Sequence, residues 1–249
     1  MGCEWLKMQV QEEDIRRMIV TKSSLRAFYR EVYDQYKACI SKIPVGGAVI
    51  ELGAGLGFST EIDSRIIRSD IKPYHGLDIV FDALAMPFKK HSVSAFLMQN
   101  VLHHIRDAEK FFAQIDHCLC SGGRVLIFDQ YPGIFAGIVL KYFHHEYYDE
   151  KAPDWTIQSR DPLIDANGAM SYIVFKRDRE TFKEKFPDLK IERMEGFDVF
   201  TYWLSGGLKE WSLLPRSLYD LSRTFDRVLL SLSPRTASSV VIELVKQGK

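Results

Sequence analysis

The stretch VIELGAGLGFST, residues 49–60, joins a short apolar run to a loop with a glycine at every second position. The run AVIEL at 48–52 is short, β-branched and close to glycines, so it predicts a buried strand. Gly53 and Gly55 allow a tight turn and a close approach of the backbone to a ligand, because no Cβ intervenes. The stretch therefore predicts a strand, a turn and a ligand site directly after the strand.

The order of residues in this loop favours one class of ligand over another. A loop that binds the pyrophosphate of a dinucleotide reads GxGxxG, but here the third glycine is Gly57 and Phe58 holds the place of the last glycine. Glu51 stands before the turn and puts negative charge where a cationic or amine-bearing ligand would lie. S-adenosylmethionine carries an ammonium and a sulfonium group, so the loop suits it better than it suits pyrophosphate.

Strands and helices alternate after the loop. The apolar runs at 65–71, 77–88, 92–100 and 124–132 predict strands, and 106–123 predicts a helix. This alternation is typical of a parallel sheet with helices on both faces, in which ligands bind beyond the carboxyl ends of the strands. The polar and glycine-rich positions that follow the predicted strands are Glu51 to Gly57, Asp70, Asp82, Asn100 and Asp129.

The last part of the chain predicts two more strands, at 188–204 and 238–246, with an amphipathic helix between them. We expect its apolar stripe to pack on the protein's own sheet. Because basic residues flank the stripe, a peripheral membrane contact or a homodimer face through 208–232 is the alternative. The stripe consists of Trp211, Leu214, Leu218, Leu221, Phe225, Val228 and Leu232.

Several segments, in order, resemble those of class I S-adenosylmethionine-dependent methyltransferases. VIELGAGLG resembles the first motif, [DE]xGxGxG, and FDALAMPF at 81–88 resembles the DA…LPF segment. QNVLHHIRDAEKFF at 99–112 is similar to the strand-to-helix stretch beside the methionine part, and CLCSGGRVLIFD at 118–129 holds the place of LKPGGRL. The resemblance implies an α/β, Rossmann-like class I methyltransferase fold, with a mostly parallel seven-stranded sheet, helices on both faces and an insertion after the fifth strand.

The resemblance also implies roles for residues. Asp70 would accept hydrogen bonds from the ribose hydroxyls, Asp82 would take the adenine amino group, and Ala83 would supply a backbone contact. S-adenosylmethionine is the implied cofactor and S-adenosylhomocysteine the product. The implied cofactor-binding residues are Glu51, Gly53, Ala54, Gly55, Gly57, Asp70, Ile71, Asp82, Ala83, Asn100 and Val101.

The candidates for a general base are His144, His145 and Asp129. A neutral histidine accepts a proton near pH 7, which a weakly acidic sugar hydroxyl would need. Adjacent side chains in HHE point in different directions, so we expect no metal site there. We expect His103 and His104 to pack or cap rather than to catalyse.

We expect a single methyltransferase domain over 1–249. It would comprise an N-terminal helical region (1–43), a cofactor-binding core (44–130), a cap or substrate insertion (131–185), and the last two strands with their intervening helix (186–249). Lys plus Arg equals Asp plus Glu at 33 each, so no nucleic acid partner is expected. The absence of a secretory signal pattern and the spacing of the four cysteines predict a cytoplasmic protein with free thiols, which could lie peripherally at the inner membrane face.

The segments FHHEYYD, RDPLIDANGA and FTYWLSGGLKEWSLLP give the tail a looser similarity to a bacterial subgroup associated with surface-polysaccharide genes. We therefore expect O-methylation of a small-molecule, glycan or lipid-linked glycan acceptor. Two alternatives stay open: a non-catalytic cofactor-binding module of the same fold, and a nicotinamide-dependent oxidoreductase, which Phe58 disfavours.

Overall fold

The computed structural model describes residues 14–44, 46–142, 147–157 and 166–248, and the side chains of these except 140–142. Residues 14–21 are helical. The strands are β1 (Ala48–Leu52), β2 (Ile66–Asp70), β3 (Ile79–Val80), β4 (Val93–Gln99), β5 (Leu119–Gln130), β6 (Leu189–Asp198) and β7 (Ser239–Lys246). The longer helices are α2 (Ser23–Ile40), α3 (Ala108–Cys118), α4 (Ile134–Tyr142), α6 (Arg179–Lys185) and α8 (Arg216–Leu232). The short ones are η1 (Ser59–Glu61), η2 (Leu102–His104), α5 (Met170–Tyr172), the π-helix η3 (Ile173–Arg177), α7 (Thr201–Leu204) and η4 (Pro234–Thr236).

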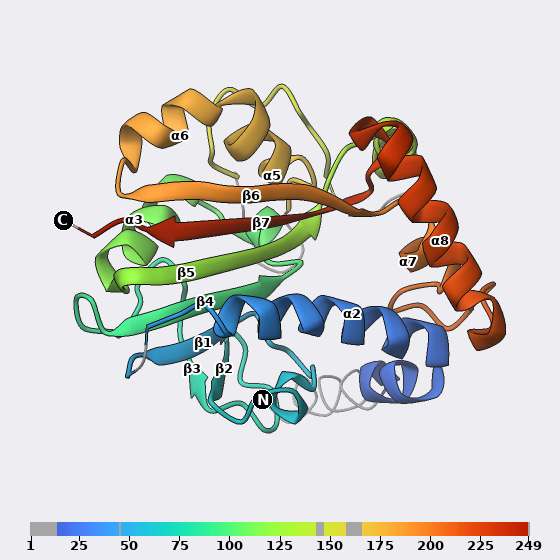
Figure 1. Cartoon of the computed structure of the whole chain (residues 1–249), viewed down its shortest axis with the longest axis horizontal. Helices are drawn as coiled ribbons and strands as arrows, with labels where there is room; N and C mark the ends of the chain where they lie inside the picture. Colours follow the sequence, from blue (N-terminus) through green and yellow to red (C-terminus); the bar gives the residue numbers. More distant parts are fainter. Residues whose placement is uncertain (1–13, 45, 143–146, 158–165, 249) are drawn as a thin grey trace, which may run out of the picture.

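The strands form one seven-stranded sheet in the order β3-β2-β1-β4-β5-β7-β6. The first five strands in this order pair in parallel, and β7 runs antiparallel to both β5 and β6 (Figure 1). The expected class I methyltransferase fold, with a mostly parallel seven-stranded sheet, is confirmed. The order places the carboxyl ends of β1 and β4 side by side at the centre, where connections leave toward opposite edges, which is the position of a ligand site in such sheets.

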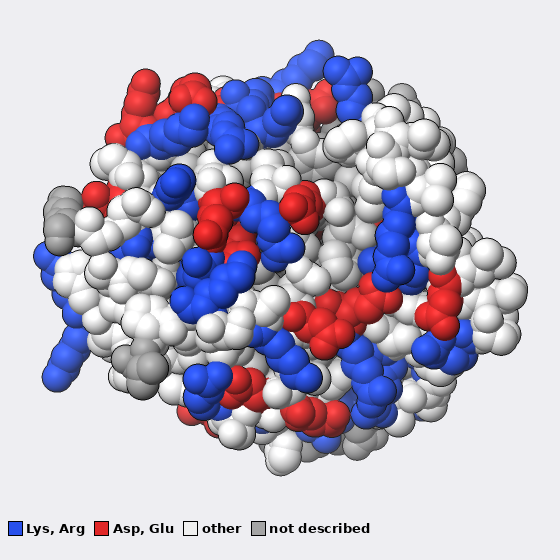
Figure 2. All heavy atoms as spheres, in the orientation of Figure 1, with Lys and Arg blue, Asp and Glu red and all other residues white. Residues whose placement is uncertain are grey.

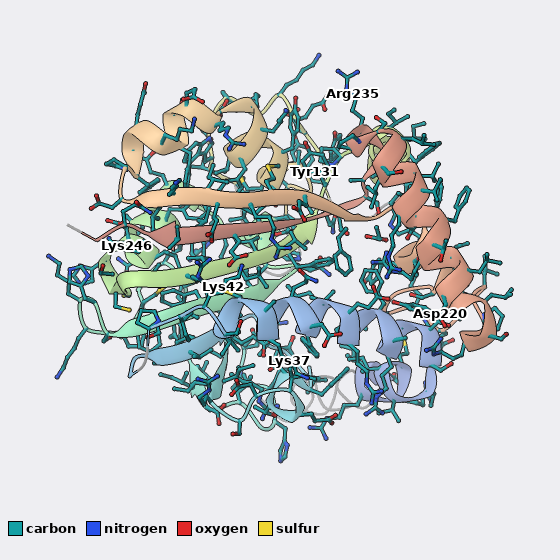
Figure 3. All side chains as sticks on the ribbon, in the orientation of Figure 1. Lys37, Lys42, Tyr131, Asp220, Arg235 and Lys246 are labelled. Atoms are coloured by element: carbon teal, nitrogen blue, oxygen red, sulfur yellow. The ribbon has the colours of Figure 1, made fainter. Side chains whose placement is uncertain are left out.

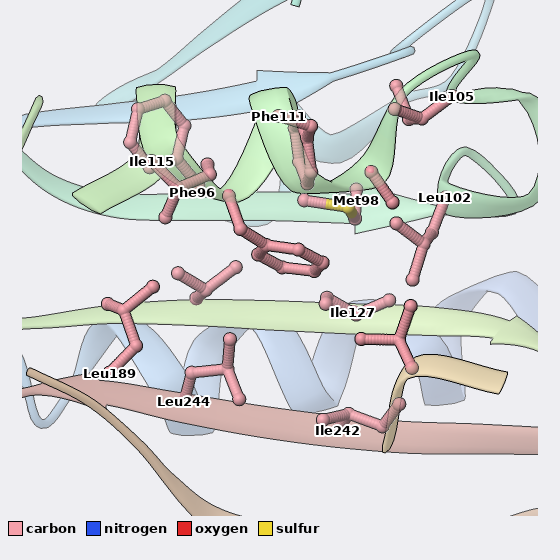
Figure 4. Packing of buried hydrophobic residues seen from close by; sticks show 14 of the residues in the cluster. Phe96, Met98, Leu102, Ile105, Phe111, Ile115, Ile127, Leu189, Ile242 and Leu244 are labelled. Atoms are coloured by element: carbon pink, nitrogen blue, oxygen red, sulfur yellow. The ribbon is translucent and has the colours of Figure 1, made fainter. Parts of the chain in front are cut away.

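Alternating side chains of the central strands belong to two hydrophobic clusters, one on each face of the sheet. From β5, Val125 and Ile127 join the cluster under α3, whereas Leu126 and Phe128 join the cluster under α2. Phe111 and Ile115 of α3 close the first cluster over the strands (Figure 4). The fold is therefore a three-layer sandwich whose central strands are apolar on both sides, as a buried parallel sheet requires.

Helix α2 covers the other face, on the near side in Figure 1. Its residues Leu25, Phe28, Val32 and Tyr36 recur at helical spacing and are each fully buried. The helix therefore forms a rigid wall against which the central strands and the glycine loop pack.

The structure departs from the sequence prediction in three strands. β5 begins at Leu119, inside the helix predicted at 106–123. The predicted strand at 188–204 ends at Asp198, and 201–204 forms the short helix α7. The predicted strand at 77–88 is reduced to the two residues of β3 at the sheet edge. After the glycine loop, only the single 3-10 turn η1 occupies the place of the helix that is usual there.

The expected packing of the stripe at 211–232 is wrong. Pro215 is the residue before the first turn of α8, so Trp211 and Leu214 precede the helix. Leu214 is buried, but the remaining stripe residues are exposed, from Trp211 at 48% to Leu232 at 77%. The buried residues of α8 are instead Tyr219, Arg223 and Asp226.

Candidate active site

A cavity of about 1040 Å³ lies at the carboxyl ends of the parallel strands. All eleven residues predicted for cofactor binding lie on its wall, contributed by the ends of β1, β2 and β4 and by the loop after β3: Glu51, Gly53, Ala54, Gly55, Gly57, Asp70, Ile71, Asp82, Ala83, Asn100 and Val101. The topology thus gathers residues up to 50 positions apart around one cavity. Their individual roles remain predictions.

The glycine turn after β1 depends on backbone angles that favour glycine. Gly53 and Gly55 have φ of +64° and +49°. A Cβ on Gly53 would lie 2.3 Å from Cγ2 of Val101, so the turn packs closely against the residue after β4. A Cβ on Gly55 would meet no protein atom within 4 Å, because this glycine borders the cavity. The turn therefore presents bare backbone to a ligand at Gly55.

Glu51, at the end of β1, is a buried carboxyl group on the cavity wall. Its side chain accepts a hydrogen bond from the Ser59 hydroxyl. Burial raises the pKa of Glu51 to about 7, against the opposing effects of Ser59 and of the positive charge of Arg68. The charge of this group is consequently set by what lies next to it, and a cation would favour the ionised form.

Phe58 faces away from the cavity. Its ring packs edge-to-face on Tyr33 of α2, with 4.9 Å between ring centroids, and its N–H donates to the Tyr33 hydroxyl at 3.3 Å. Phe58 thus anchors the loop to α2, whereas a glycine at this position would leave the loop open to a pyrophosphate.

Asp70 is the last residue of β2, and Asp82 lies in the loop after β3. Asp70 accepts the N–H groups of Gly55 and Lys72, each at 3.0 Å, one on each carboxylate oxygen. Burial raises the pKa of Asp70. A carboxylate has about four acceptor sites, so Asp70 keeps capacity for two hydroxyl groups. Asp82 accepts the N–H of Leu84 and a guanidinium N–H of Arg106, both at 2.8 Å.

Asn100 turns the chain after β4. Its φ of +55° is one that Asn tolerates better than most residues, and its N–H donates to the carbonyl of Phe128 at 2.8 Å. This turn directs the chain into η2 and brings His103 beside the end of β5.

The sequence did not reveal the pairing of His103 with Asp129. His103 Nδ1 contacts Asp129 Oδ1, and the His103 backbone N–H donates to Asp129 Oδ2 at 3.2 Å. Asp129 is fully buried, whereas His103, although 1% exposed, lies on the cavity wall. The expectation that His103 only packs or caps omitted this contact. The sole signal for it was that His103 follows β4 and Asp129 lies at the end of β5, its neighbour in the sheet.

Asp129 indicates which nitrogen of His103 holds the proton, because carboxylate oxygens accept and Nδ1 is the nitrogen that faces Asp129. The side-chain Nε2 of Gln130 lies 3.3 Å from His103 Nε2. In this arrangement His103 Nε2 is an acceptor and Nδ1 carries the proton, directed at Asp129. This is the tautomer that a histidine general base requires.

The other predicted bases have different positions. His144 and His145 lie outside the described residues. Asp129 lies behind His103 and reaches the cavity through it, so it orients the histidine rather than contacting a ligand. Across the described residues, no group of three or more His, Cys, Asp or Glu side chains is arranged to hold a metal ion.

Two distant segments close the outer side of the cavity. Residues 14, 15 and 17–19 of the N-terminal helical stretch and 206–211 of the α7–α8 loop both line it. Lys22, which follows the N-terminal helical stretch, connects the two segments, because its ammonium group donates to the carbonyls of Gly207 at 2.6 Å and Lys209 at 2.9 Å. Within the described residues, no helix is both long and apolar enough to cross a membrane.

Residues 50–127 match the family model described as a methyltransferase domain. No curated protein matches the chain. A SAM-dependent methyltransferase from Archaeoglobus fulgidus superposes with a TM-score of 0.52 at 12% identity, over 87% of this chain and 94% of that one.

Two further structures superpose with a TM-score of 0.50. One is from the complex between the Haloferax volcanii Trm112 methyltransferase activator and a methyltransferase, at 15% identity over 95% of this chain and 98% of that one. The other is the YcgJ protein of Bacillus subtilis, at 14% identity over 89% of this chain and 100% of that one. At such identities the similarity shows a shared fold.

Proposed function

We propose that this chain, which has the class I methyltransferase fold and matches a methyltransferase domain model over residues 50–127, transfers a methyl group from S-adenosylmethionine to an acceptor oxygen. The observation that carries the proposal is the wall of the cavity. It combines exposed backbone at Gly55, acceptor capacity on Asp70 and a histidine–aspartate pair within a single space.

The residues present fit this cofactor. Gly55 gives backbone access without a Cβ, Asp70 has acceptor sites for the ribose hydroxyls, and Glu51 offers a carboxyl group to the ammonium. The adenine would lie near Asp82 and Ala83, although Arg106 already holds one Asp82 oxygen. S-adenosylmethionine supplies an activated methyl group on a positively charged sulfur, so the chain's own residues need only position the acceptor and remove its proton.

His103 is the group that would take this proton. As the acceptor oxygen bonds to the methyl carbon, the methyl–sulfur bond would break and leave its electron pair on sulfur. The hydroxyl proton would pass to His103 Nε2, where the acceptor hydroxyl takes the place of the Gln130 amide. Asp129 stabilises the resulting imidazolium, because its carboxylate already faces Nδ1 in the buried interior. A hydroxyl acceptor needs such a base, which favours O-methylation of a small-molecule or glycan acceptor.

Two measurements test this proposal: cofactor binding tests the cofactor assignment, and turnover tests the methyl transfer. Calorimetry should show binding of S-adenosylmethionine and S-adenosylhomocysteine, and a panel of hydroxyl acceptors should be screened by release of S-adenosylhomocysteine. Asp82→Ala should weaken cofactor binding without unfolding the chain. Binding without turnover on any acceptor would instead identify a non-catalytic cofactor-binding module, and no binding by well-folded protein would contradict the cofactor assignment.

A further inference from the structure

Helix α8 turns its polar side inward. Arg223 Nε donates to a carboxylate oxygen of Glu31 on α2 at 2.9 Å, and Arg223 also bonds Asp226 at 3.2 Å. Asp226 accepts the N–H groups of Phe200 at 2.9 Å and Thr201 at 3.2 Å. These buried bonds fix the rotation of the helix about its axis, so its apolar side must face outward.

The outward side of α8 belongs to a larger surface, which we call the outer apolar surface. The ring of Phe200 lies 5.0 Å from that of Phe135 on α4 and 6.4 Å from that of Phe225 on α8, which links the two helices. In Figure 2 the edge of the molecule that α8 forms is largely free of charged side chains. The exposed members are Ile134, Phe135, Ile138, Leu204, Leu208, Trp211, Leu213, Leu218, Leu221, Phe225, Val228 and Leu232.

This surface is continuous with the mouth of the cavity. Leu208 and Trp211 line the cavity and yet are 41% and 48% exposed, so they lie where the cavity opens. Val139 of α4 and Trp203 of α7 also line the cavity. A molecule that enters at this mouth therefore passes along exposed apolar side chains.

We propose that the outer apolar surface docks on an anionic lipid bilayer. A helix with a wide apolar face and Leu, Phe and nearby Trp side chains is typical of segments that lie in the plane of a membrane interface. Docking presents the cavity mouth to the bilayer, where an acceptor with a lipid chain would be held. This last step rests on the proposed methyl transfer, whereas docking itself does not.

The charges around the surface favour anionic lipid. Exposed basic side chains near it are Lys209, Arg216, Arg227 and Arg235, and the exposed acidic ones are Glu210 and Asp220. Arg216 pairs with Asp220 at 3.5 Å and Arg227 with Glu31 at 3.8 Å, so the positive charge offered to lipid lies mainly at Lys209 and Arg235. Figure 3 shows Asp220 near one end of α8 and Arg235, in η4, beyond the other end. A second copy of the chain on the same surface would close the mouth at Trp211 to an acceptor, whereas a bilayer there would itself hold an acceptor with a lipid chain, so we favour lipid over a dimer.

Flotation of the full-length protein with vesicles tests the proposal. Vesicles of phosphatidylcholine, with and without phosphatidylglycerol, should be compared at low and high salt. We expect flotation with the mixed vesicles, weakened by salt. The double variant Leu221→Glu/Phe225→Glu should lower partitioning by at least about tenfold, because two apolar side chains leave the interface. Thr224→Glu/Ser231→Glu adds the same charge on exposed positions outside the apolar stripe, and should float nearly as wild type does.

Three outcomes would overturn the docking proposal: no flotation of the wild type, an equal loss in both double variants, or a dimer in light scattering that only the Leu221→Glu/Phe225→Glu change dissociates. Calorimetry with S-adenosylmethionine on the same preparations separates this proposal from the methyl-transfer proposal. Protein that binds the cofactor but not vesicles contradicts docking alone, and protein that floats without binding the cofactor contradicts the function alone.

Discussion

At the scale of single residues, His103 and Asp129 show how two distant positions form one chemical unit. They are 26 positions apart, one in η2 and one at the end of β5. The sequence indicated that each follows a strand, and Asp129 was predicted as a candidate base. It could not show that the histidine would stand between Asp129 and the cavity, because the pairing depends on the turn that Asn100 makes after β4.

Removing the His103 imidazole should stop proton transfer and leave the cofactor site intact. We expect His103→Gln to lower kcat by about a hundredfold or more on a hydroxyl acceptor, with the S-adenosylmethionine Kd unchanged within about twofold. Asp129→Asn should lower kcat as well and shift the pH–rate profile, because the carboxylate that stabilises the imidazolium is gone. Steady-state kinetics with calorimetry measures both quantities.

His117→Gln is the matched control, since His117 is exposed on α3 and does not line the cavity. Unchanged kcat in His103→Gln would show that another group is the base or that no base is needed. If His103→Gln lowers the melting temperature enough for unfolding to explain the lost activity, His103 has a structural role instead.

Glu51 makes stability depend on pH. Its pKa in the folded chain is about 7, against 4.5 as the ordinary value, so between these two pH values the folded state binds the proton more tightly than the unfolded state. The contribution of Glu51 to stability is therefore present at low pH and is lost as pH rises through about 7. The shift corresponds to a loss on the order of 3 kcal/mol.

Glu51→Gln removes this dependence. The free energy of unfolding of the wild type should fall more between about pH 5 and pH 8 than that of the variant, with the difference growing up to about pH 7 and staying constant above it. Denaturant unfolding at several pH values measures it. Parallel pH dependences for the two proteins would show that the Glu51 carboxyl is not buried as the structure has it.

Gly53 combines a positive φ with close packing on Val101. Gly53→Ala should lower the free energy of unfolding by about 1–3 kcal/mol, because the new Cβ is strained at this φ and displaces Val101. The S-adenosylmethionine affinity should fall at the same time by at least about tenfold, since the turn borders the cavity.

Gly137→Ala provides the comparison, because Gly137 lies in α4 and a Cβ there would lie 4.0 Å from the carbonyl oxygen of Pro132, an ordinary contact distance. It should keep wild-type affinity and stability. Wild-type cofactor affinity in Gly53→Ala would contradict the place we assign to the cofactor.

At the scale of elements, α8 shows what an amphipathic pattern does not specify. The spacing from Leu218 to Leu232 correctly predicts a helix with one apolar side, but the pattern does not say which side faces the protein. Here the inward direction is decided by Arg223 and Asp226, whose bonds reach Glu31 and the backbone of α7. Those partners are far away in the chain, so the pattern of the helix alone could not indicate them.

Asp226→Ala should destabilise the protein strongly. The change leaves the N–H groups of Phe200 and Thr201 without their acceptor and leaves Arg223 with one fewer anion in the buried interior, a loss on the order of 3 kcal/mol. Asp220→Ala is its control on the same helix: Asp220 is exposed, with a 3.5 Å ion pair to Arg216 worth at most about 0.5 kcal/mol. Similar unfolding free energies for both variants would show that the inward side of α8 is not fixed as described.

At the scale of the whole molecule, the order of strands and the position of the cavity follow from the alternation of strands and helices along the chain. Right-handed crossovers place consecutive parallel strands so that the residues after β1, β2, β3 and β4 meet at one edge. The closing segments at 14–19 and 206–211 could not be predicted, because they meet through single contacts such as that of Lys22 with Gly207.

The central claim is that this cavity binds S-adenosylmethionine. Titration calorimetry of the wild type and of Gly53→Ala, with Gly137→Ala beside them, tests it most directly. We predict one site per chain for the wild type and Gly137→Ala, and an affinity lower by at least about tenfold in Gly53→Ala. No heat of binding in folded wild-type protein, or the same affinity in all three, would contradict the claim.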